Sequence, residues 1–195
     1  MITLHVKSDG DVWFGVACNK EKVFATNFGF SKIGILRSLL EYVPFNIPFQ
    51  YSEENFSFAE YVLDIVKDVY RGKDVAGDVS LALEHLSKYA RRVIKTVSFI
   101  PIGYVSSYGS VAKTSGGSPR AVGHVMAHNP FAPIVPCHRV VCSDFTLGGY
   151  SGGLNVKLDL LKREKRGYSG SREIQVNSKR LEIFPVEFVL RKSAK

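Results

Sequence analysis

Apolar residues at the front of the chain first alternate with polar ones and then recur every three or four positions. The first two alternating stretches flank Ser8-Asp9-Gly10-Asp11, a natural hairpin turn because glycine accepts a positive φ. Ser31 and Pro44 bracket one helical stretch, and Ser57 with Glu60 forms a capping-box pattern before another. The pattern predicts strands at 2–7, 12–17 and 22–28, a helix after Ser31 and a helix over 61–70.

From residue 86 onward the helical period dominates. A helix is expected over 86–97, where apolar residues recur at spacings of four. Two short helices follow, and the second opens with Ser118 as N-cap and Pro119 at its first position. The Gly-containing turn Ser115-Gly116-Gly117 joins them, which is the helix-turn-helix pattern. The expected elements are helices around 108–113 and 118–128, a glycine-rich loop at 147–153, a helix from 154 to near 167, and a strand over 181–190 interrupted by Pro185.

These elements predict an α+β/α fold class with two domains. A small mixed α/β scaffold domain is expected at 1–80, linked through the polar stretch 72–80 to a mainly helical DNA-binding domain at 81–168. The second domain is expected to contain a (winged) helix-turn-helix. Residues 169–195 form a C-terminal tail to which the sequence assigns no role.

The net charge of +8 is unevenly distributed, which supports this division. Residues 1–85 have 8 basic and 12 acidic side chains, whereas 86–168 have 12 basic and 3 acidic, a net charge of +9. The second domain is therefore expected to face a polyanion, although a solvated basic face without a partner has the same pattern. The chain lacks an apolar run near the ~20 residues of a membrane span, and its first residues do not resemble a signal peptide. Three cysteines imply no disulfide framework, so a reducing cytoplasm is expected.

Cys137-His138 is the first candidate for chemistry. A thiolate is the reactive form of cysteine, and a nearby base raises its fraction. Adjacent side chains usually point apart, so a turn is needed to bring the two together, and Pro136 favours one. Without further support, such a dipeptide is an ordinary coincidence. A zinc site is the competing interpretation, with His124 and His128 one helical turn apart and Cys137, His138 and Cys142 downstream. These residues contain no Cys-x-x-Cys, and the His124–His128 pair would occupy the second helix of the two. Cys18 and Cys142 are interpreted as small buried hydrophobes.

Pro136-Cys137-His138-Arg139-Val140-Val141 resembles the active-site hexapeptide of the O6-alkylguanine-DNA alkyltransferases. The flanking motifs agree in order and spacing over about 86–167: Ser107-Tyr108-Gly109, Arg120-Ala121-Val122-Gly123, Asn129-Pro130, and Gly149-Tyr150-Ser151-Gly152-Gly153-Leu154 with Lys157, Leu161 and Glu164 beyond. Residues 1–85 are compatible only in the order of their elements. The Cys/His set with which some members of the family bind zinc is absent from this region, so no structural metal is expected. No cofactor is expected either.

The resemblance implies a catalytic role for each matched position. Cys137 would take the alkyl group and keep it, His138 would accept the thiol proton, and Glu164 would orient that imidazole. Tyr108 would give a hydrogen bond or proton to the departing guanine. Asn129 would hold the turn before the active-site loop. Taken alone, Glu164 is an ordinary surface acid and Tyr108 a packed aromatic residue.

The same resemblance implies two binding surfaces. The base would be read by Ser151 and the backbone of Cys137 and Val140, between apolar walls of Met126 and Tyr150. Gly152 would also belong to this substrate site. Double-stranded DNA would be contacted through Ser107, Tyr108, Arg120, Ala121 and Gly123. Arg120 would fill the gap left by the flipped base. Met126 alone is a typical core residue, and Arg120 alone a surface cation.

The function implied is single-turnover repair of O6-alkylguanine, and of O4-alkylthymine, by a monomeric methylated-DNA–protein-cysteine S-methyltransferase. Two alternatives stay open. A non-catalytic sensor of alkylated DNA usually lacks the cysteine that is present here. A helix-turn-helix transcription regulator with a reactive cysteine would bind a specific DNA sequence. A cysteine hydrolase is a more distant possibility, and its covalent intermediate would turn over.

Overall fold

The computed structural model describes residues 1–54, 56–75 and 79–194, so part of the expected linker at 72–80 (residues 76–78) lies outside the described residues. The chain divides into two compact units. The first is Met1–His85 with Pro130–Ile134, and the second is Leu86–Asn129 with the chain from Val135 onward. The structure therefore places the described part of 169–195 within the second unit. None of the helices among the described residues is long and apolar enough to cross a membrane.

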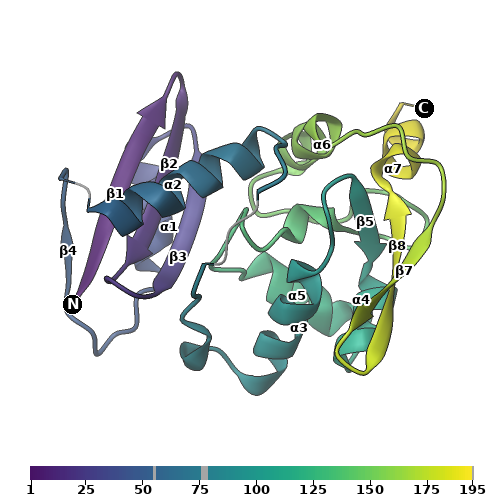
Figure 1. The fold of residues 1–195 in the computed structure, drawn as a ribbon, viewed down its shortest axis with the longest axis horizontal. Coiled ribbons are helices and arrows are strands. Elements are labelled where there is room, and N and C mark those ends of the chain that lie inside the picture. The colour runs from purple at the N-terminus through teal and green to yellow at the C-terminus, as the bar shows by residue number, and fades with distance from the viewer. Residues whose placement is uncertain (55, 76–78, 195) are drawn as a thin grey trace. The chain divides into compact units, whose positions relative to one another are not determined.

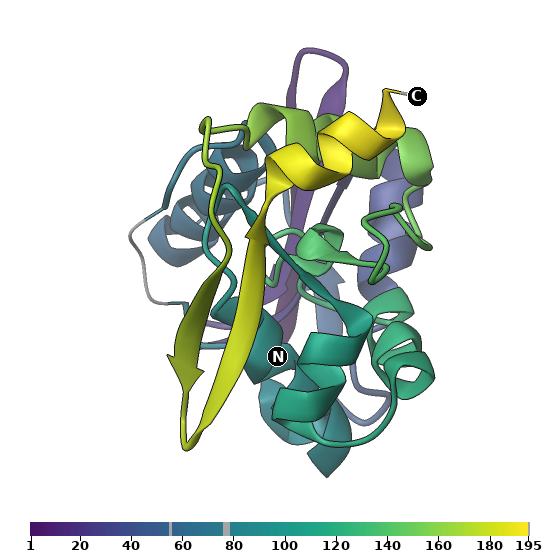
Figure 2. The same cartoon turned by 90° about the vertical axis from the view of Figure 1, so that its right-hand side faces the viewer.

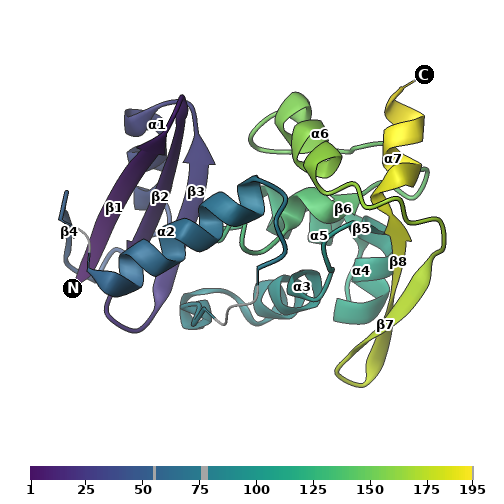
Figure 3. The same ribbon diagram turned by 45° about the horizontal axis from the view of Figure 1, so that its top comes forward.

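The first unit is a four-stranded sheet of order β3-β2-β1-β4 with a helix on each face (Figures 1 and 3). Gly10, at φ 59°, turns the chain between the first two strands, as the pattern predicted. Helix α1 covers the face where Gly15 lies, since a Cβ there would collide with the side chain of Ile35. Helix α2 covers the other face, where the rings of Phe14 and Tyr70 are 5.4 Å apart. The elements are β1 (Ile2–Asp9), β2 (Val12–Cys18), β3 (Val23–Gly29), α1 (Lys32–Leu40), β4 (Phe49–Tyr51), α2 (Ser57–Tyr70) and a 3-10 turn at Leu83–His85.

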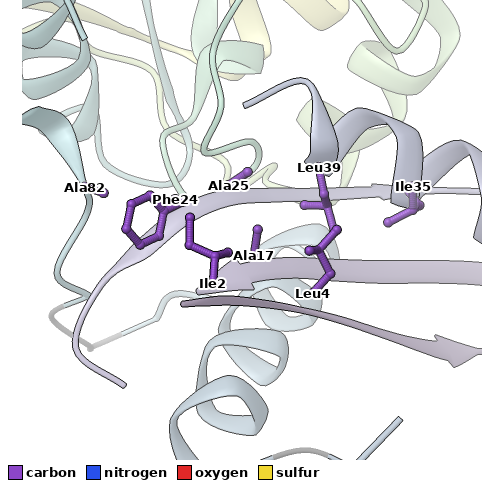
Figure 4. Packing of buried hydrophobic residues seen from close by; sticks show 8 residues of the cluster. All are labelled: Ile2, Leu4, Ala17, Phe24, Ala25, Ile35, Leu39 and Ala82. Carbon is purple, nitrogen blue, oxygen red and sulfur yellow. The ribbon is translucent and has the colours of Figure 1, made fainter. Parts of the chain in front are cut away.

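Figure 4 shows the core on the α1 side of this sheet, where Ile2, Leu4 and Ala17 meet Ile35 and Leu39. Ser31 caps α1 by accepting the N–H of Gly34 at 3.3 Å, as expected. The capping box at Ser57 was wrong, because Phe56 is the N-cap residue of α2 and no side chain caps it. Packing of the apolar face of α2 stabilises this helix instead.

The second unit contains a helical bundle and a four-stranded sheet of order β6-β5-β8-β7 (Figures 1 and 2). The prediction of a mainly helical domain therefore omitted a sheet. Ser107 and Ser118 cap α4 and α5, and Gly116 and Gly117, at φ 85° and 92°, form the turn between these helices. The elements are α3 (Lys88–Ser98), β5 (Tyr104–Ser107), α4 (Tyr108–Ser115), α5 (Pro119–Ala127), a 3-10 turn at Cys137–Arg139, β6 (Val140–Val141), α6 (Leu154–Arg163), β7 (Arg172–Val176), β8 (Lys179–Pro185) and α7 (Val186–Ser193).

The C-terminal segment corrects one prediction. The strand expected over 181–190 ends at Pro185, and residues 186–190 belong to α7. In this helix Val186 and Val189 are buried against Leu161 of α6. A helix buries these residues on one face, which the β-branched composition of the segment did not reveal.

Candidate active site

Cys137 lies at the start of a 3-10 turn that buries its side chain. Pro136 (φ −80°, ψ 67°) begins the turn, and its carbonyl accepts the N–H of Arg139 at 2.9 Å. The N–H of Cys137 donates to the carbonyl of Val135 at 2.8 Å. The turn needed to bring Cys137 and His138 into one site is therefore present.

His138 and Glu164 form a buried hydrogen bond of 2.8 Å between Nε2 and Oε1. Glu164 is the C-cap residue of α6, and its N–H donates to the carbonyls of Leu160 and Leu161. Glu164 faces inward, as the role implied by the resemblance requires, and it is only 1% exposed. Among the described residues, Nδ1 of His138 has no hydrogen-bond partner.

Arg139 is a third member of this cluster that the sequence analysis missed. Its Nε and Nη2 donate to both carboxylate oxygens of Glu164 at 2.9–3.1 Å, and its Nη1 donates to the carbonyl of Ile100 at 2.6 Å. Burial would raise the pKa of Glu164, but its interactions with His138 and Arg139 outweigh burial and hold the pKa at about 2. An arginine side chain stays charged in proteins, so Arg139 is a permanent counterion for the Glu164 carboxylate.

Burial is also the largest influence on the pKa of each of the two reactive groups, His138 and Cys137. It lowers the pKa of His138 more than the nearby Glu164 raises it, so the imidazole is neutral and able to accept a proton. Burial raises the pKa of the Cys137 thiol, opposed by a hydrogen bond with the Asn129 side chain and by the charge of Lys157. The thiol therefore needs a base to become a thiolate.

Asn129 connects the second helix of the pair to the cysteine. It lies two residues beyond α5, and its Nδ2 donates to the carbonyl of Val135 at 2.9 Å while its side chain also bonds the Cys137 thiol. A single buried amide thus holds two points of the chain from 135 to 137.

Lys157 is the second residue that the sequence analysis left without a role. Its side chain is fully buried, and its Nζ donates to the carbonyls of Val140, Leu147 and Gly149 at 2.6, 2.6 and 3.2 Å. Burial lowers its pKa to about 8, while the neighbouring thiols Cys137 and Cys142 raise it. Lys157 joins strand β6 to the loop that carries Tyr150 and Ser151.

A cavity of about 550 Å³ opens at Cys137. Tyr150 and Ser151 contribute to it as expected, and burial raises the pKa of Tyr150 well above its usual value and that of Tyr108 to about 12. Both phenols are therefore protonated hydrogen-bond donors at neutral pH. Two expected members, Val140 and Gly152, are not among the lining residues. The lining residues are Tyr108, Pro119, Arg120, Gly123, Met126, Ala127, Cys137, Gly149, Tyr150 and Ser151.

The residues expected to contact DNA have different surroundings. Arg120 is exposed in the first turn of α5 and lines the cavity. Ala121 is half-buried, and its N–H donates to Oγ of Ser118 at 3.2 Å. Ser107 is buried, and its hydroxyl accepts the N–H of Ser110 at 2.9 Å, so its side chain serves the helix cap. Gly123 lines the cavity, and a Cβ there would lie 3.9 Å from the Tyr108 ring.

The zinc interpretation has no geometric support in the described part of the chain. No group of three or more His, Cys, Asp or Glu side chains there is placed to hold a metal ion. The rings of His124 and His128 pack against each other with centroids 4.4 Å apart, and Nδ1 of His128 is bonded to the carbonyl of His124.

Comparison with known proteins gives the family of the chain. Residues 88–166 match the family model of the 6-O-methylguanine DNA methyltransferase DNA-binding domain. A methylated-DNA–protein-cysteine methyltransferase of Methanothermobacter thermautotrophicus is 41% identical over 104 residues, which are 53% of this chain and 59% of that protein. One of Mycobacterium leprae is 41% identical over 115 residues, which are 57% of this chain and 68% of that protein.

A solved structure of Mycobacterium tuberculosis OGT in complex with DNA superimposes with a TM-score of 0.66 at 28% identity, covering 84% of this chain and 92% of that one. The sequence matches and the fold thus point to one class of protein. The chain belongs to the 6-O-methylguanine DNA methyltransferase family. Its match to the M. thermautotrophicus relative spans less than two thirds of that protein.

Proposed function

We propose that the protein repairs alkylated DNA by moving the alkyl group of O6-alkylguanine, or of O4-alkylthymine, onto Sγ of Cys137. The proposal is carried by one observation: the buried Cys137 lines a cavity of base-binding size and shares its 3-10 turn with a buried, neutral histidine that is bonded to an ionised glutamate. Cavities of a few hundred Å³ accommodate drug-sized ligands, and a purine with its adduct is of that size.

The chemical step conserves atoms and charge. Sγ forms a bond to the alkyl carbon while the bond between that carbon and O6 of guanine breaks. The thiol proton passes to Nδ1 of His138. This nitrogen is available as the acceptor because the other ring nitrogen, Nε2, is bonded to Glu164. Tyr108, as a protonated phenol, supplies a proton to the departing guanine, and His138 restores it. Asn129 holds the cysteine loop in place.

The product explains why each molecule would react once. Alkyl transfer leaves a thioether on Cys137, and the C–S bond of a thioether is not hydrolysed in neutral water. No regeneration step is proposed, and neither metal nor cofactor takes part.

The DNA surface is proposed to be the helix-turn-helix formed by α4 and α5, in a protein that acts as a monomer on double-stranded DNA. Its support is the exposed Arg120 at the edge of the cavity and the small residue Gly123 behind it. A base enters such a cavity only after leaving the duplex, at a cost of a few kcal/mol. Arg120 would occupy the space that the base leaves, while Met126 and Tyr150 line the cavity and Ser151 reads the base edge.

The test is an intact-mass measurement after incubation with duplex DNA containing O6-methylguanine. One added methyl group, mapped to the peptide of Cys137, is expected. Cys137→Ser should bind the same duplex without gaining mass, whereas Cys18→Ala and Cys142→Ala should still take the methyl group. Tight binding by the wild type without any gain in mass would instead identify a non-catalytic sensor.

A further inference from the structure

The C-terminal segment lies beyond the residues matched by the family model, yet it packs against the elements that carry the site. Strand β8 pairs antiparallel with β5, placing Tyr104 opposite Pro185 and Val105 opposite Phe184. The other edge of β5 pairs with β6, the strand that follows the Cys137 turn. In Figure 2 the β7–β8 hairpin and α7 run beside these elements in yellow.

The first contact fixes the end of α6. Glu187 lies in the first turn of α7 and is 6% exposed. Its Oε1 accepts the N–H groups of Arg166 and Gly167 at 3.2 and 2.5 Å. These two residues follow Glu164 closely in the chain, so Glu187 ties the segment just after Glu164 to the C-terminal helix.

The second contact fixes the turn before the substrate loop. Phe145 has a φ of 65°, which non-glycine residues rarely adopt. Its ring meets the rings of Phe184 and Phe188 edge to face, at centroid distances of 5.1 and 5.3 Å. Its N–H donates to the carbonyl of Cys142 at 3.0 Å. The chain continues from this turn directly into the loop of Tyr150 and Ser151.

We propose that Glu187, Phe184 and Phe188 are positioning residues for alkyl transfer. Glu187 sets the placement of Glu164 on His138, and the two phenylalanines set the placement of the substrate loop. This inference rests on the proposed function. A misplacement of about 1 Å at a reacting group costs up to ~10²-fold in rate, so such supports affect chemistry without touching the substrate.

Loss of each contact is expected to change a different kinetic constant. Both constants are obtained by measuring the alkylation rate at increasing concentrations of the free base O6-benzylguanine. Phe188→Ala should raise the half-saturating concentration about tenfold or more and leave the maximal rate within about twofold. Glu187→Ala should lower the maximal rate about tenfold or more, shift its pH profile, and leave the half-saturating concentration unchanged. Glu187→Gln retains an oxygen that can accept both N–H groups and should recover most of the rate.

Ile174→Ala is the matched control, because Ile174 is a half-buried apolar residue of β7 in the same segment. It should leave both constants unchanged. Loss of folded protein lowers the amount of alkyl group incorporated per mole of protein, but it alters neither constant. Phe188→Ala and Glu187→Ala variants with wild-type constants would overturn the proposal.

Hydrogen exchange gives a readout that does not depend on activity. Phe188→Ala should speed amide exchange in residues 142–151 and spare 164–168, and Glu187→Ala should do the reverse. Uniform change in both regions, or none, would also overturn the proposal. If the wild type itself takes up no alkyl group, the proposed function fails, while the exchange pattern still decides whether these contacts hold the two regions.

Discussion

Arg139 binds both carboxylate oxygens of Glu164, the residue that also accepts a hydrogen bond from His138. Breaking a buried ion pair by removing one partner typically costs about 3–5 kcal/mol, because the remaining charge stays buried. Arg139 therefore does more than add one contact. It makes it possible for an ionised glutamate to remain inside the protein beside a neutral imidazole.

The first prediction concerns this pair. Arg139→Met should lower the free energy of unfolding by about 3 kcal/mol or more, measured by urea denaturation. Arg180→Met is the control, because Arg180 bonds Glu173 at a similar distance of 3.0 Å but on the surface. An exposed pair contributes less than about 1 kcal/mol, so this variant should unfold near the wild-type midpoint. Equal losses in the two variants would contradict the structural role of Arg139.

The second prediction concerns the rate of transfer. Glu164→Gln removes the negative charge that stabilises protonated His138 while keeping the size of the side chain. Alkylation of O6-methylguanine DNA should slow on the order of 10²-fold, a typical contribution of acid–base assistance. Rapid-quench measurement of methyl transfer at saturating DNA checks this. A wild-type rate would exclude the relay through His138 and Glu164, although Cys137 could still be the nucleophile.

The third prediction follows from the pKa of Glu164, which lies at about 2 in the folded protein against 4.5 for the unperturbed group. A depressed pKa contributes stability above pH 4.5, and this contribution is lost as the pH falls toward 2. The difference in unfolding free energy between wild type and Glu164→Gln should therefore shrink over this window, by on the order of 3 kcal/mol. A difference that is independent of pH would show that the carboxylate has an ordinary pKa.

The parts that the sequence predicted well depend on local signals. Ser118 and Pro119 fix the start of α5 through capping and backbone geometry alone. The hexapeptide around Cys137 identified the candidate nucleophile, whereas Glu164 became a candidate only through the family resemblance.

The parts that were missed depend on residues far away in the chain. Strand β5 was not expected because its partner β8 comes about 80 residues later, and β4 has only three residues. The sequence analysis gave Arg139 and Lys157 no role, because their acceptors lie 25 and 17 residues away in the chain. Hydrophobic periodicity does not reveal a buried charged side chain, because its burial depends on the groups that pair with it in the folded protein.

The last prediction separates base flipping from simple DNA binding, using Arg120. Arg120 is exposed at the edge of the cavity, so its loss should leave the cavity and the Cys137 turn intact. Arg120→Ala should slow repair of O6-methylguanine in duplex DNA about tenfold or more relative to attack on free O6-benzylguanine, which needs no flipping.

Salt dependence provides the control for this interpretation. Each phosphate contact adds about 0.9 to the slope of log affinity against log salt, so Arg120→Ala should change that slope by about one unit at most. Arg91 and Arg92 lie on α3 in the basic second unit, and we propose that they contact phosphate. Replacing both should then weaken DNA binding while the free-base reaction is unchanged. Because the comparison is a ratio of rates on two substrates, modest losses of active protein cancel. Equal slowing of both reactions by Arg120→Ala would mean that Arg120 supports the cavity itself, and its proposed role in the duplex would have to be abandoned.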